Sequence, residues 1–333
     1  MRAMVLAAPC AANLQLRDLP DPVAGPGEVL VRLRAASLNY RDLVVLEGGY
    51  GRQQKPADLI PLCDGAGEVA ALGAGVHGWR VGERVIGCMF PRWLDGASSD
   101  EKVAGALGVE ADGTACELRV FPAGALVPMP DGLSFEEAAC LPCAALTAFT
   151  AVRGAAEGAV VLTQGSGGVS LFALQFAAAR GARVIATSSS PEKLERLKAL
   201  GATDLIDYRA DPQWGRTVRR LTGEVGCDLV VDIGGGSTID QALRAVRRSG
   251  TIAVIGVVGG AAPPVNLARV AMNAIELKGV TVGSRADFLE MLDAIQAHAI
   301  HPVIDSAHPL AQLPQALERL ASGRHFGKVC LSI

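Results

Sequence analysis

The chain lacks a concentration of charge of either sign. Its 333 residues carry 31 Lys and Arg against 34 Asp and Glu, which gives a formal net charge of −3. Basic residues are scattered among acidic ones, with no basic stripe of the kind that nucleic acid or an anionic lipid surface requires. We therefore expect a small-molecule partner, with no nucleic acid and no membrane.

Long hydrophobic runs are also absent, although 50% of the residues are hydrophobic. Nothing reaches the roughly 18 consecutive apolar residues that a membrane-spanning helix needs. The first residues, MRAMVLAAP, hold only a brief apolar stretch with no convincing cleavage site after it. We expect a cytoplasmic protein, and a chain of this length predicts two domains that each bury a core.

A disulfide framework is missing as well. The 8 cysteines are dispersed along the whole chain, whereas small secreted domains concentrate theirs, so free thiols are expected. Cys140 and Cys143 have the Cys-x-x-Cys spacing of a redox pair, but nothing else resembles a thioredoxin active site. The favoured interpretation is that these cysteines are small buried side chains.

The most informative stretch runs from residue 159 to 187 and predicts a strand, a glycine turn, a helix and a second strand. Glycines at 165 and 167 let backbone N–H groups approach a phosphate that side chains would obstruct. The helix that follows points its positive end at that phosphate. A glycine turn alone is weak evidence, but its place in this unit favours dinucleotide binding. The pattern departs from the usual fingerprint at Ser170, where a third glycine is typical.

The rest of the chain divides into two kinds of sequence. Residues 1–144 are rich in glycine, proline and short β-type runs, whereas 145–271 alternates strand and helix patterns. That alternation predicts an α/β fold with a doubly wound parallel sheet. The expected strands are 160–163, 183–187, 205–206, 228–233 and 251–257, and the expected helices between them include 191–200, 214–222 and 238–249. Residues 272–333 return to mixed structure and are assigned to the first part. The polar segment 89–115 is interpreted as a surface excursion, with a substrate-side lid as the alternative.

Several separated motifs resemble those of a known family. They are SLNYRDL (37–43), PLCDGAGEVAALGAGV (61–76), VGERV (81–85), DGLSFEEAACLPCAALTAF (131–149), the glycine turn, ALGATDLIDYR (199–209) and HFGKV (325–329). In this order they resemble the medium-chain dehydrogenase/reductases, in the zinc-independent branch of quinone oxidoreductases and zinc-type alcohol dehydrogenase-like proteins. The resemblance implies a GroES-like β-rich catalytic domain at 1–144 and 272–333 and a Rossmann dinucleotide-binding domain at 145–271, with the active site in the cleft between them.

The family's zinc enzymes hold their catalytic ion with a cysteine, a histidine and a cysteine in three of these motifs. At those positions this chain has Asn39, Cys63 and Cys143. An amide is a poor ligand for zinc, and a catalytic zinc needs three protein ligands, so no metal is expected. The alternative, in which Asp64 completes a residual site with the two cysteines, stays open. The family's structural zinc needs four close cysteines, and segment 89–115 contains none.

The position after the second strand lacks the Asp or Glu that holds the ribose 2′-hydroxyl in NAD-selective sites. Thr187 to Ser190 stand there, and hydroxyls with a nearby cation, Lys193, can bind a 2′-phosphate that a carboxylate would repel. NADP(H) is therefore preferred over NAD(H), although a solvated helix lysine is the alternative for Lys193. With the positions that the resemblance adds, the predicted cofactor-binding residues are Thr147, Gly165, Gly167, Gly168, Val169, Ser188, Ser189, Lys193, Tyr208, Ile255, Gly256 and Lys328.

Without a Lewis acid, nothing stabilises the alkoxide from which an alcohol loses hydride, whereas an electron-poor quinone or enone needs less help. The preferred function is thus an NADPH-dependent, zinc-free oxidoreductase that transfers hydride to quinones or α,β-unsaturated carbonyl compounds. Tyr40 is the candidate acid or polarising donor, with Asn39 beside it and Asp42 behind. Simple packing is the alternative for Tyr40.

Two other functions remain open. One is an NAD(P)-dependent alcohol dehydrogenase with a residual metal site, and the other is a non-catalytic nucleotide-binding protein. The resemblance also implies a homodimer that forms by extension of the Rossmann sheet edge, for which the run VTVGS at 280–284 is the candidate strand.

Overall fold

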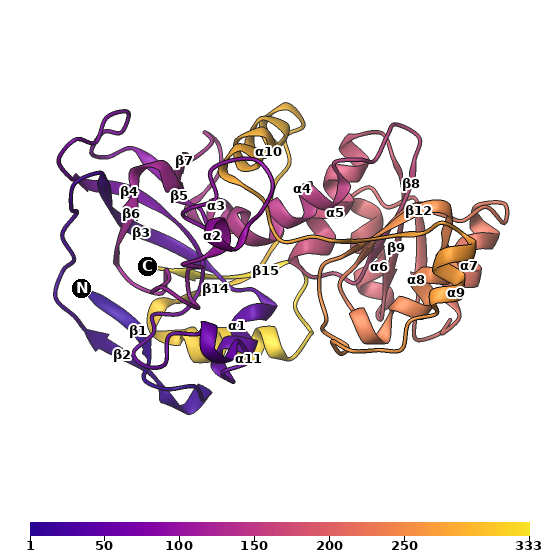
Figure 1. Ribbon diagram of the computed structural model, residues 1–333, viewed down its shortest axis with the longest axis horizontal. Coiled ribbons are helices and arrows are strands. Elements are labelled where there is room, and N and C mark those ends of the chain that lie inside the picture. The colour runs from indigo at the N-terminus through magenta and orange to yellow at the C-terminus, as the bar shows by residue number, and fades with distance from the viewer. The chain divides into compact units, whose positions relative to one another are not determined.

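The computed structural model describes all 333 residues, and the chain forms two compact units (Figure 1). The first unit holds Met1–Leu146 and Gly283–Ile333, and the second holds Thr147–Val282. The expected α/β class is confirmed. The chain returns to the first unit at Gly283, later than the expected residue 272. The reason is that the strand Glu276–Gly279 still pairs within the sheet of the second unit.

The first unit is built on a seven-stranded sheet beside a two-stranded one, β1 with β2. The larger sheet has the order β14-β15-β3-β4-β5-β7, and β6 pairs with β3. The strands are β1 (Arg2–Leu6), β2 (Leu14–Asp18), β3 (Glu28–Ser37), β4 (Asp64–Leu72), β5 (Arg84–Gly87), β6 (Leu118–Pro122), β7 (Leu126–Pro128), β14 (Ile304–Pro309) and β15 (Lys328–Ser332). The helices are α1 (Tyr40–Leu46), α2 (Asp100–Val103), α3 (Phe135–Ala139), α10 (Arg285–Ala297) and α11 (Leu313–Ala321).

The last strand brings the end of the chain to the middle of this sheet. Strand β15 pairs antiparallel with β3, so that Cys330 lies opposite Ser37. Strand β3 also pairs antiparallel with β4, where Ser37 lies opposite Asp64. Segments from three distant parts of the sequence therefore meet where β3 ends, and the candidate catalytic residues begin two positions later at Asn39.

The segment 89–115 is more than the surface excursion that its polar composition suggested. Only its middle, around the short helix α2, is exposed, whereas Phe90, Trp93 and Leu107 are buried. Gly113 packs so closely on the backbone of Leu62 that an added Cβ would lie 1.8 Å from the carbonyl oxygen of Leu62. The ends of the segment thus belong to the core of the first unit.

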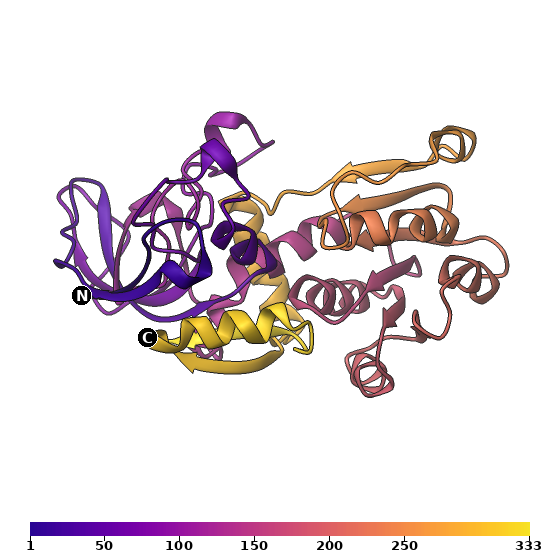
Figure 2. The same ribbon diagram turned by 90° about the horizontal axis from the view of Figure 1, so that it is seen from below.

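The second unit is a six-stranded, fully parallel sheet in the order β10-β9-β8-β11-β12-β13. Helices α5 and α6 pack on one face, and α7 and α8 pack on the opposite face (Figure 2). The strands are β8 (Val160–Gln164), β9 (Arg183–Ser188), β10 (Asp204–Asp207), β11 (Cys227–Asp232), β12 (Val246–Val254) and β13 (Glu276–Gly279). The helices are α4 (Leu146–Val152), α5 (Gly168–Ala179), α6 (Pro191–Ala199), α7 (Trp214–Leu221), α8 (Ile239–Ala245) and α9 (Leu267–Met272).

Two local predictions in this part of the chain are wrong. The helix expected to reach residue 249 ends at Ala245, because the fully buried Val246 starts β12 opposite Cys227. The run 280–284 is not a strand, because Ser284 caps helix α10 and accepts a hydrogen bond from the backbone N–H of Asp287. The edge of the parallel sheet is β13 instead. None of the helices combines the length and the apolar character that crossing a membrane requires.

Candidate functional site

The glycine turn after β8 has the geometry of a phosphate cradle. Gly165 has φ +76°, a backbone conformation that residues other than glycine adopt only at a cost in free energy. Gly167 caps helix α5 with an ordinary φ of −80°, and a Cβ added to it would meet no atom of the chain within 4 Å. Nothing in the chain itself therefore requires glycine at 167, but a ligand that approaches the backbone would.

The start of helix α5 leaves hydrogen-bond donors for such a ligand. Gly167 offers no side chain to cap the helix, so the first backbone N–H groups, including those of Gly168 and Val169, have no intrahelical acceptor. Ser170, which replaces the usual third glycine, is buried, and its hydroxyl donates to the carbonyl of Gln164 at 2.6 Å. The serine thus ties the first turn of the helix to the end of β8.

The carboxyl ends of β9 and β10 bring together residues that were predicted to select the cofactor. Ser188 lies opposite Asp207, and its carbonyl accepts the backbone N–H of Tyr208 at 3.1 Å. Ser188 is buried, Ser189 is half-buried, and Tyr208 is 40% exposed. Lys193 lies in the first turn of α6, directly after this strand end.

The Asp207 carboxylate is the nearest acidic group along the chain to Tyr208, and it already accepts hydrogen bonds from the backbone. One of its oxygens accepts the backbone N–H groups of Arg209 and Ala210, at 2.9 and 3.3 Å. It holds the turn that carries Tyr208. From Ser188 to Pro191 the chain offers hydroxyls and no carboxylate, and Glu192 and Lys193 follow in the first turn of α6.

The ends of β11 and β12 form two interlocked glycine loops. The Asp232 carboxylate accepts the N–H groups of Gly234 and Gly235, and the carbonyl of Asp232 accepts the N–H of Ile255 at 2.9 Å. Burial raises the pKa of Asp232 against the opposing effect of these hydrogen bonds. A Cβ at Gly256 would lie 2.5 Å from a backbone oxygen of residue 233, so this close approach requires glycine.

The first unit holds a cluster of buried polar side chains around Asp64. One carboxylate oxygen of Asp64 accepts the hydroxyl of Ser37 at 2.9 Å and the amide N–H of Asn39 at 2.8 Å. The ammonium group of Lys328 lies 3.4 Å from the same oxygen and donates to Oδ1 of Asn39 and to the carbonyl of Leu38, both at 2.6 Å. Both ends of the Asn39 amide are thus engaged inside the cluster.

Lys328 is 3% exposed and Asp64 is fully buried. Burial alone would lower the pKa of Lys328, but Asp64 and three cysteines, Cys140, Cys143 and Cys330, together raise it above its ordinary value. The lysine is therefore held as a cation inside the first unit. Lys328 was predicted to bind the cofactor, whereas the structure gives its ammonium group three acceptors in this cluster. One signal was available in the sequence, because a lone lysine in the apolar strand KVCLS requires a buried partner.

Two cysteines adjoin the cluster. Ligand atoms of Cys63, Asp64 and Cys143 all lie within 4.8 Å of one another, which is close enough for three groups to share a metal ion. The Cys63 thiol donates to the second Asp64 oxygen at 3.1 Å, and burial raises the pKa of that thiol well above its ordinary range.

The donor chemistry of these residues does not fit a catalytic zinc. Zinc binds thiolates and needs three protein ligands. Here the Asp64 carboxylate already accepts Ser37, Asn39, Cys63 and Lys328, and the third position of the motif is the Asn39 amide. A zinc ion would have to compete with the Lys328 cation for Asp64.

The two remaining catalytic candidates differ in exposure. Tyr40 begins helix α1 and is 46% exposed. Asp42 is buried, and its carboxylate accepts the backbone N–H of Asn39 at 2.7 Å. Burial raises the pKa of Asp42 to about 6. Asp42 thus fixes the backbone that carries Asn39 and Tyr40.

The cysteines with the redox-like spacing have other neighbours. The Cys140 and Cys330 sulfurs lie 3.5 Å apart between α3 and β15, whereas Cys143 groups with Cys63. None of the 8 cysteines forms a disulfide. Thr147, one of the predicted cofactor-binding residues, is buried on α4.

Comparison with known proteins gives matches along nearly the whole chain. Residues 25–131 match the alcohol dehydrogenase GroES-like domain, and residues 168–297 match the zinc-binding dehydrogenase family. The zinc-type alcohol dehydrogenase-like protein of Schizosaccharomyces pombe is 43% identical over 92% of this chain and 91% of its own length. A quinone oxidoreductase of Pseudomonas aeruginosa is 33% identical over 96% of this chain and 95% of its own length.

Solved structures agree with these matches. An NAD-dependent alcohol dehydrogenase superposes with a TM-score of 0.91 at 36% identity, and the match covers 100% of both chains. A mycobacterial protein complexed with NADPH superposes with a TM-score of 0.84 at 29% identity, again over 100% of both chains. The expected GroES-like and Rossmann parts are thereby confirmed. On this evidence, the chain belongs to the medium-chain dehydrogenase/reductase superfamily, whose members are NAD(P)-dependent oxidoreductases.

Proposed function

We propose that this chain is an NADPH-dependent oxidoreductase that works without zinc and transfers hydride to quinones or α,β-unsaturated carbonyl compounds. The observation that carries the proposal is the Asn39 amide, which stands at a zinc-ligand position and is bound to Asp64 and Lys328. With no Lewis acid to stabilise an alkoxide, acceptors that are already electron-poor are the fitting substrates.

The cofactor half of the proposal rests on the second unit. The open space over Gly167 and the donors at the start of α5 suit a pyrophosphate. Ser188, Lys193 and Tyr208 gather at the neighbouring strand ends, where a 2′-phosphate needs donors and a cation. Bound NADPH would supply the hydride.

Tyr40 is the proposed donor to the substrate carbonyl oxygen. The Tyr40 residue is partly exposed, and Asp42 and Lys328 fix the backbone and the amide of the neighbouring Asn39. Asn39 is accordingly a positioning residue, because neither end of its amide is free to contact a substrate. A quinone oxidoreductase among the relatives supports this substrate class.

A second candidate function is a metal-dependent alcohol dehydrogenase. The close approach of Cys63, Asp64 and Cys143 favours it. The test is a set of steady-state rates on a quinone, an enone and a primary alcohol with NADPH, NADH and their oxidised forms. We expect turnover of the quinone or enone with NADPH. Alcohol oxidation alone, with none of the other acceptors reduced, would refute the proposal.

The proposed dimer uses a different strand from the one predicted. Strand β13 has a hydrogen-bonded neighbour only on the β12 side, and all four of its residues are exposed. An antiparallel pairing of two such edges would give a twelve-stranded sheet across the dimer, by doubling the six-stranded one. Light scattering on the purified protein tests it, and a monomeric mass at micromolar concentration would exclude the dimer.

A further inference from the structure

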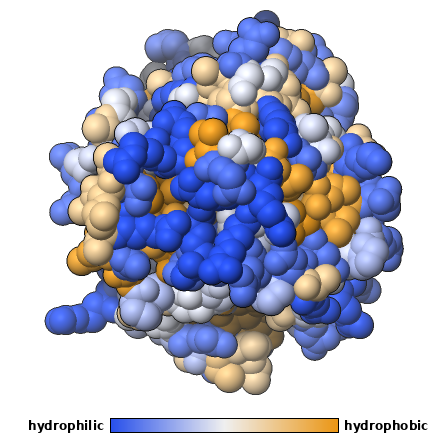
Figure 3. Space-filling view, turned by 90° about the vertical axis from the view of Figure 1, so that its right-hand side faces the viewer, coloured by the Kyte–Doolittle hydropathy of each residue, from blue (hydrophilic) through white to orange (hydrophobic).

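Helices α7, α8 and α9 line a cavity of about 720 Å³ that is open to solvent on the outer side of the second unit. Five arginines line it: Arg216, Arg219, Arg220, Arg244 and Arg269. Figure 3 shows the side of the molecule that carries these helices, where strongly hydrophilic side chains gather around a hollow. The volume falls within the roughly 300–1,000 Å³ of small-molecule sites.

Two of these arginines build the wall of the cavity. Arg219 donates to the carbonyls of Arg244 and Val246, and Arg269 donates to the carbonyl of Leu243, all at 2.8 to 2.9 Å. These carbonyls lie at the C-terminal end of α8 and just beyond it, where a helix leaves acceptors without partners. Their presence is thus explained by the fold.

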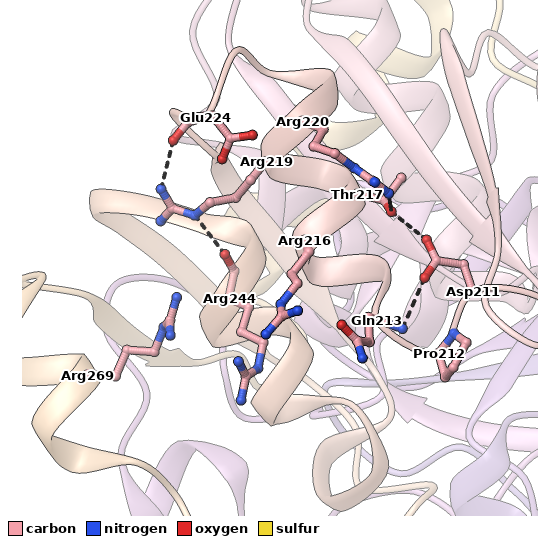
Figure 4. Close-up of a pocket in the computed structure, with 10 residues that line it drawn as sticks. All are labelled: Asp211, Pro212, Gln213, Arg216, Thr217, Arg219, Arg220, Glu224, Arg244 and Arg269. Carbon is pink, nitrogen blue, oxygen red and sulfur yellow. Dashed lines mark hydrogen bonds between the residues drawn. The ribbon is translucent and has the colours of Figure 1, made fainter.

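The other three arginines are not explained in this way. The Arg216 guanidinium makes no hydrogen bond or ion pair with the chain, and the Arg220 guanidinium contacts only Thr217, one turn away on the same helix. Arg244 pairs with the exposed Asp240. Figure 4 shows the Arg216 and Arg244 side chains extending into the same space. Both also line a second cavity of about 170 Å³.

Positive charge exceeds negative charge around this space. Against the five guanidinium groups stand three carboxylates, of which Asp211 and Glu224 line the cavity and Asp240 is bound to Arg244. Asp211 is engaged with Thr217 and the backbone N–H of Gln213. Burial, and next the charges of Arg244 and Arg219, lower the pKa of Arg269. Such crowding of like charges is unusual in a chain whose net charge is −3.

We propose that this cavity binds a compact small-molecule polyanion with several phosphate or carboxylate groups. Guanidinium groups bind either group through two parallel hydrogen bonds. No aromatic side chain lines the cavity, so it offers no surface on which a base could stack. A compact anion therefore fits better than a nucleotide or a nucleic acid strand.

This site differs from the proposed cofactor site. The cavity belongs to α7, α8 and α9, whereas the glycine turn opens at α5, which packs on the opposite face of the sheet from α8. The proposal is independent of the reaction that the chain performs.

The test is calorimetric titration with sodium tripolyphosphate and, in a second arm, with citrate. The full chain is saturated with NADPH and held at constant ionic strength, so that the glycine turn does not take up the probe. We expect saturable binding at one site per chain. Arg216→Glu should weaken it at least about tenfold, because it replaces a charge-assisted donor with a repelling charge.

The matched control is Arg324→Glu, which makes the same charge change at an exposed arginine of the first unit. It should leave the affinity within about twofold. Loss of binding in the Arg216 variant with either anion supports the proposal, and the two arms identify the preferred group. No saturable binding by the wild type, or equal affinity in the Arg216 and Arg324 variants, would overturn it. Unliganded melting curves of the variants establish that both are folded.

Discussion

The ammonium nitrogen of Lys328 lies 2.6 Å from Oδ1 of Asn39, across 289 positions of the sequence. This contact exists because β15 pairs beside β3 and returns the end of the chain to the candidate active site. Through this contact Oδ1 of Asn39 is hydrogen-bonded inside the first unit. The ammonium charge of Lys328 also compensates the charge of Asp64. The first unit therefore carries a fixed cation from its own sequence next to the position where zinc enzymes of the family hold a metal.

Replacement of this lysine tests the cluster. Lys328→Met should lower the free energy of unfolding by about 3–5 kcal/mol, because it leaves the Asp64 carboxylate buried without a cation. Adding Asp64→Asn to that variant should recover at least about 1 kcal/mol, since the two residues interact directly. Urea unfolding measures both values.

A partly exposed ion pair provides the comparison. Lys55 and Asp112 form a pair at 2.8 Å with side chains 33% and 32% exposed. Lys55→Met should cost less than about 1 kcal/mol. If Lys328→Met costs no more than this control, the buried cluster does not stabilise the fold as described.

The protonation of Asp42 should appear in the pH dependence of stability. Its pKa in the folded chain is about 6 against an ordinary value of 3.8, with burial as the largest cause. The folded chain keeps this proton longer than the unfolded chain, so the contribution is present below pH 4 and is lost as the pH rises through 6. The total is on the order of 3 kcal/mol.

Asp42→Asn isolates this effect, because an amide oxygen can still accept the backbone N–H of Asn39. The difference in unfolding free energy between the wild type and this variant should therefore shift in favour of the variant as the pH rises from 4 to 7. Urea unfolding at several pH values checks it. Parallel stability curves for the two proteins would contradict the raised pKa of Asp42.

The glycine turn offers a substitution that separates folding from binding. Gly167→Ala should change stability by less than about 0.5 kcal/mol, because its φ is −80° and no atom lies near the new Cβ. NADPH affinity should fall at least about tenfold, because that Cβ occupies the approach of the pyrophosphate. Gly165→Ala, at φ +76°, should instead cost about 1–2 kcal/mol of stability. Unchanged NADPH affinity in the Gly167 variant would refute the cradle.

Cofactor preference is tested on helix α6. Lys193→Glu should weaken NADPH binding by at least about tenfold while NADH binding changes little, because only the 2′-phosphate would meet the new carboxylate. Lys198→Glu, in the last turn of the same helix and exposed, is the control and should affect neither nucleotide. Fluorescence titration gives the four affinities. An equal loss for NADPH and NADH would remove the argument for Lys193.

The sequence predicted the second unit well because its signals are local. Apolar runs, glycine turns and capped helices repeat along residues 160–207, and the strands lie within one or two residues of the expected positions. The error at residues 246–249 has a local cause too. Arg247, Arg248 and Ser249 are polar enough to continue a helix pattern, but they lie in β12 between Val246 and Thr251, which both pair with β11.

The buried cluster could be predicted only in part. The sequence placed Asn39, Cys63 and Cys143 together through the resemblance, but Lys328 and Ser37 join them through pairing of β15 with β3 and of β3 with β4. Such pairings depend on the whole sheet, so no pattern of residue spacing in the sequence predicts them. For the same reason the arginine cavity, whose residues come from three separate helices, gave no signal along the chain.

The most direct test of the account is the rate of NADPH oxidation with a quinone or enone acceptor before and after chelator treatment, with zinc measured by elemental analysis. We predict that the treated protein retains its rate at a zinc content far below one ion per chain, and that added zinc does not raise it. A rate that disappears with the metal and returns when zinc is restored would show that Cys63, Asp64 and Cys143 hold a working ion, and would contradict the account.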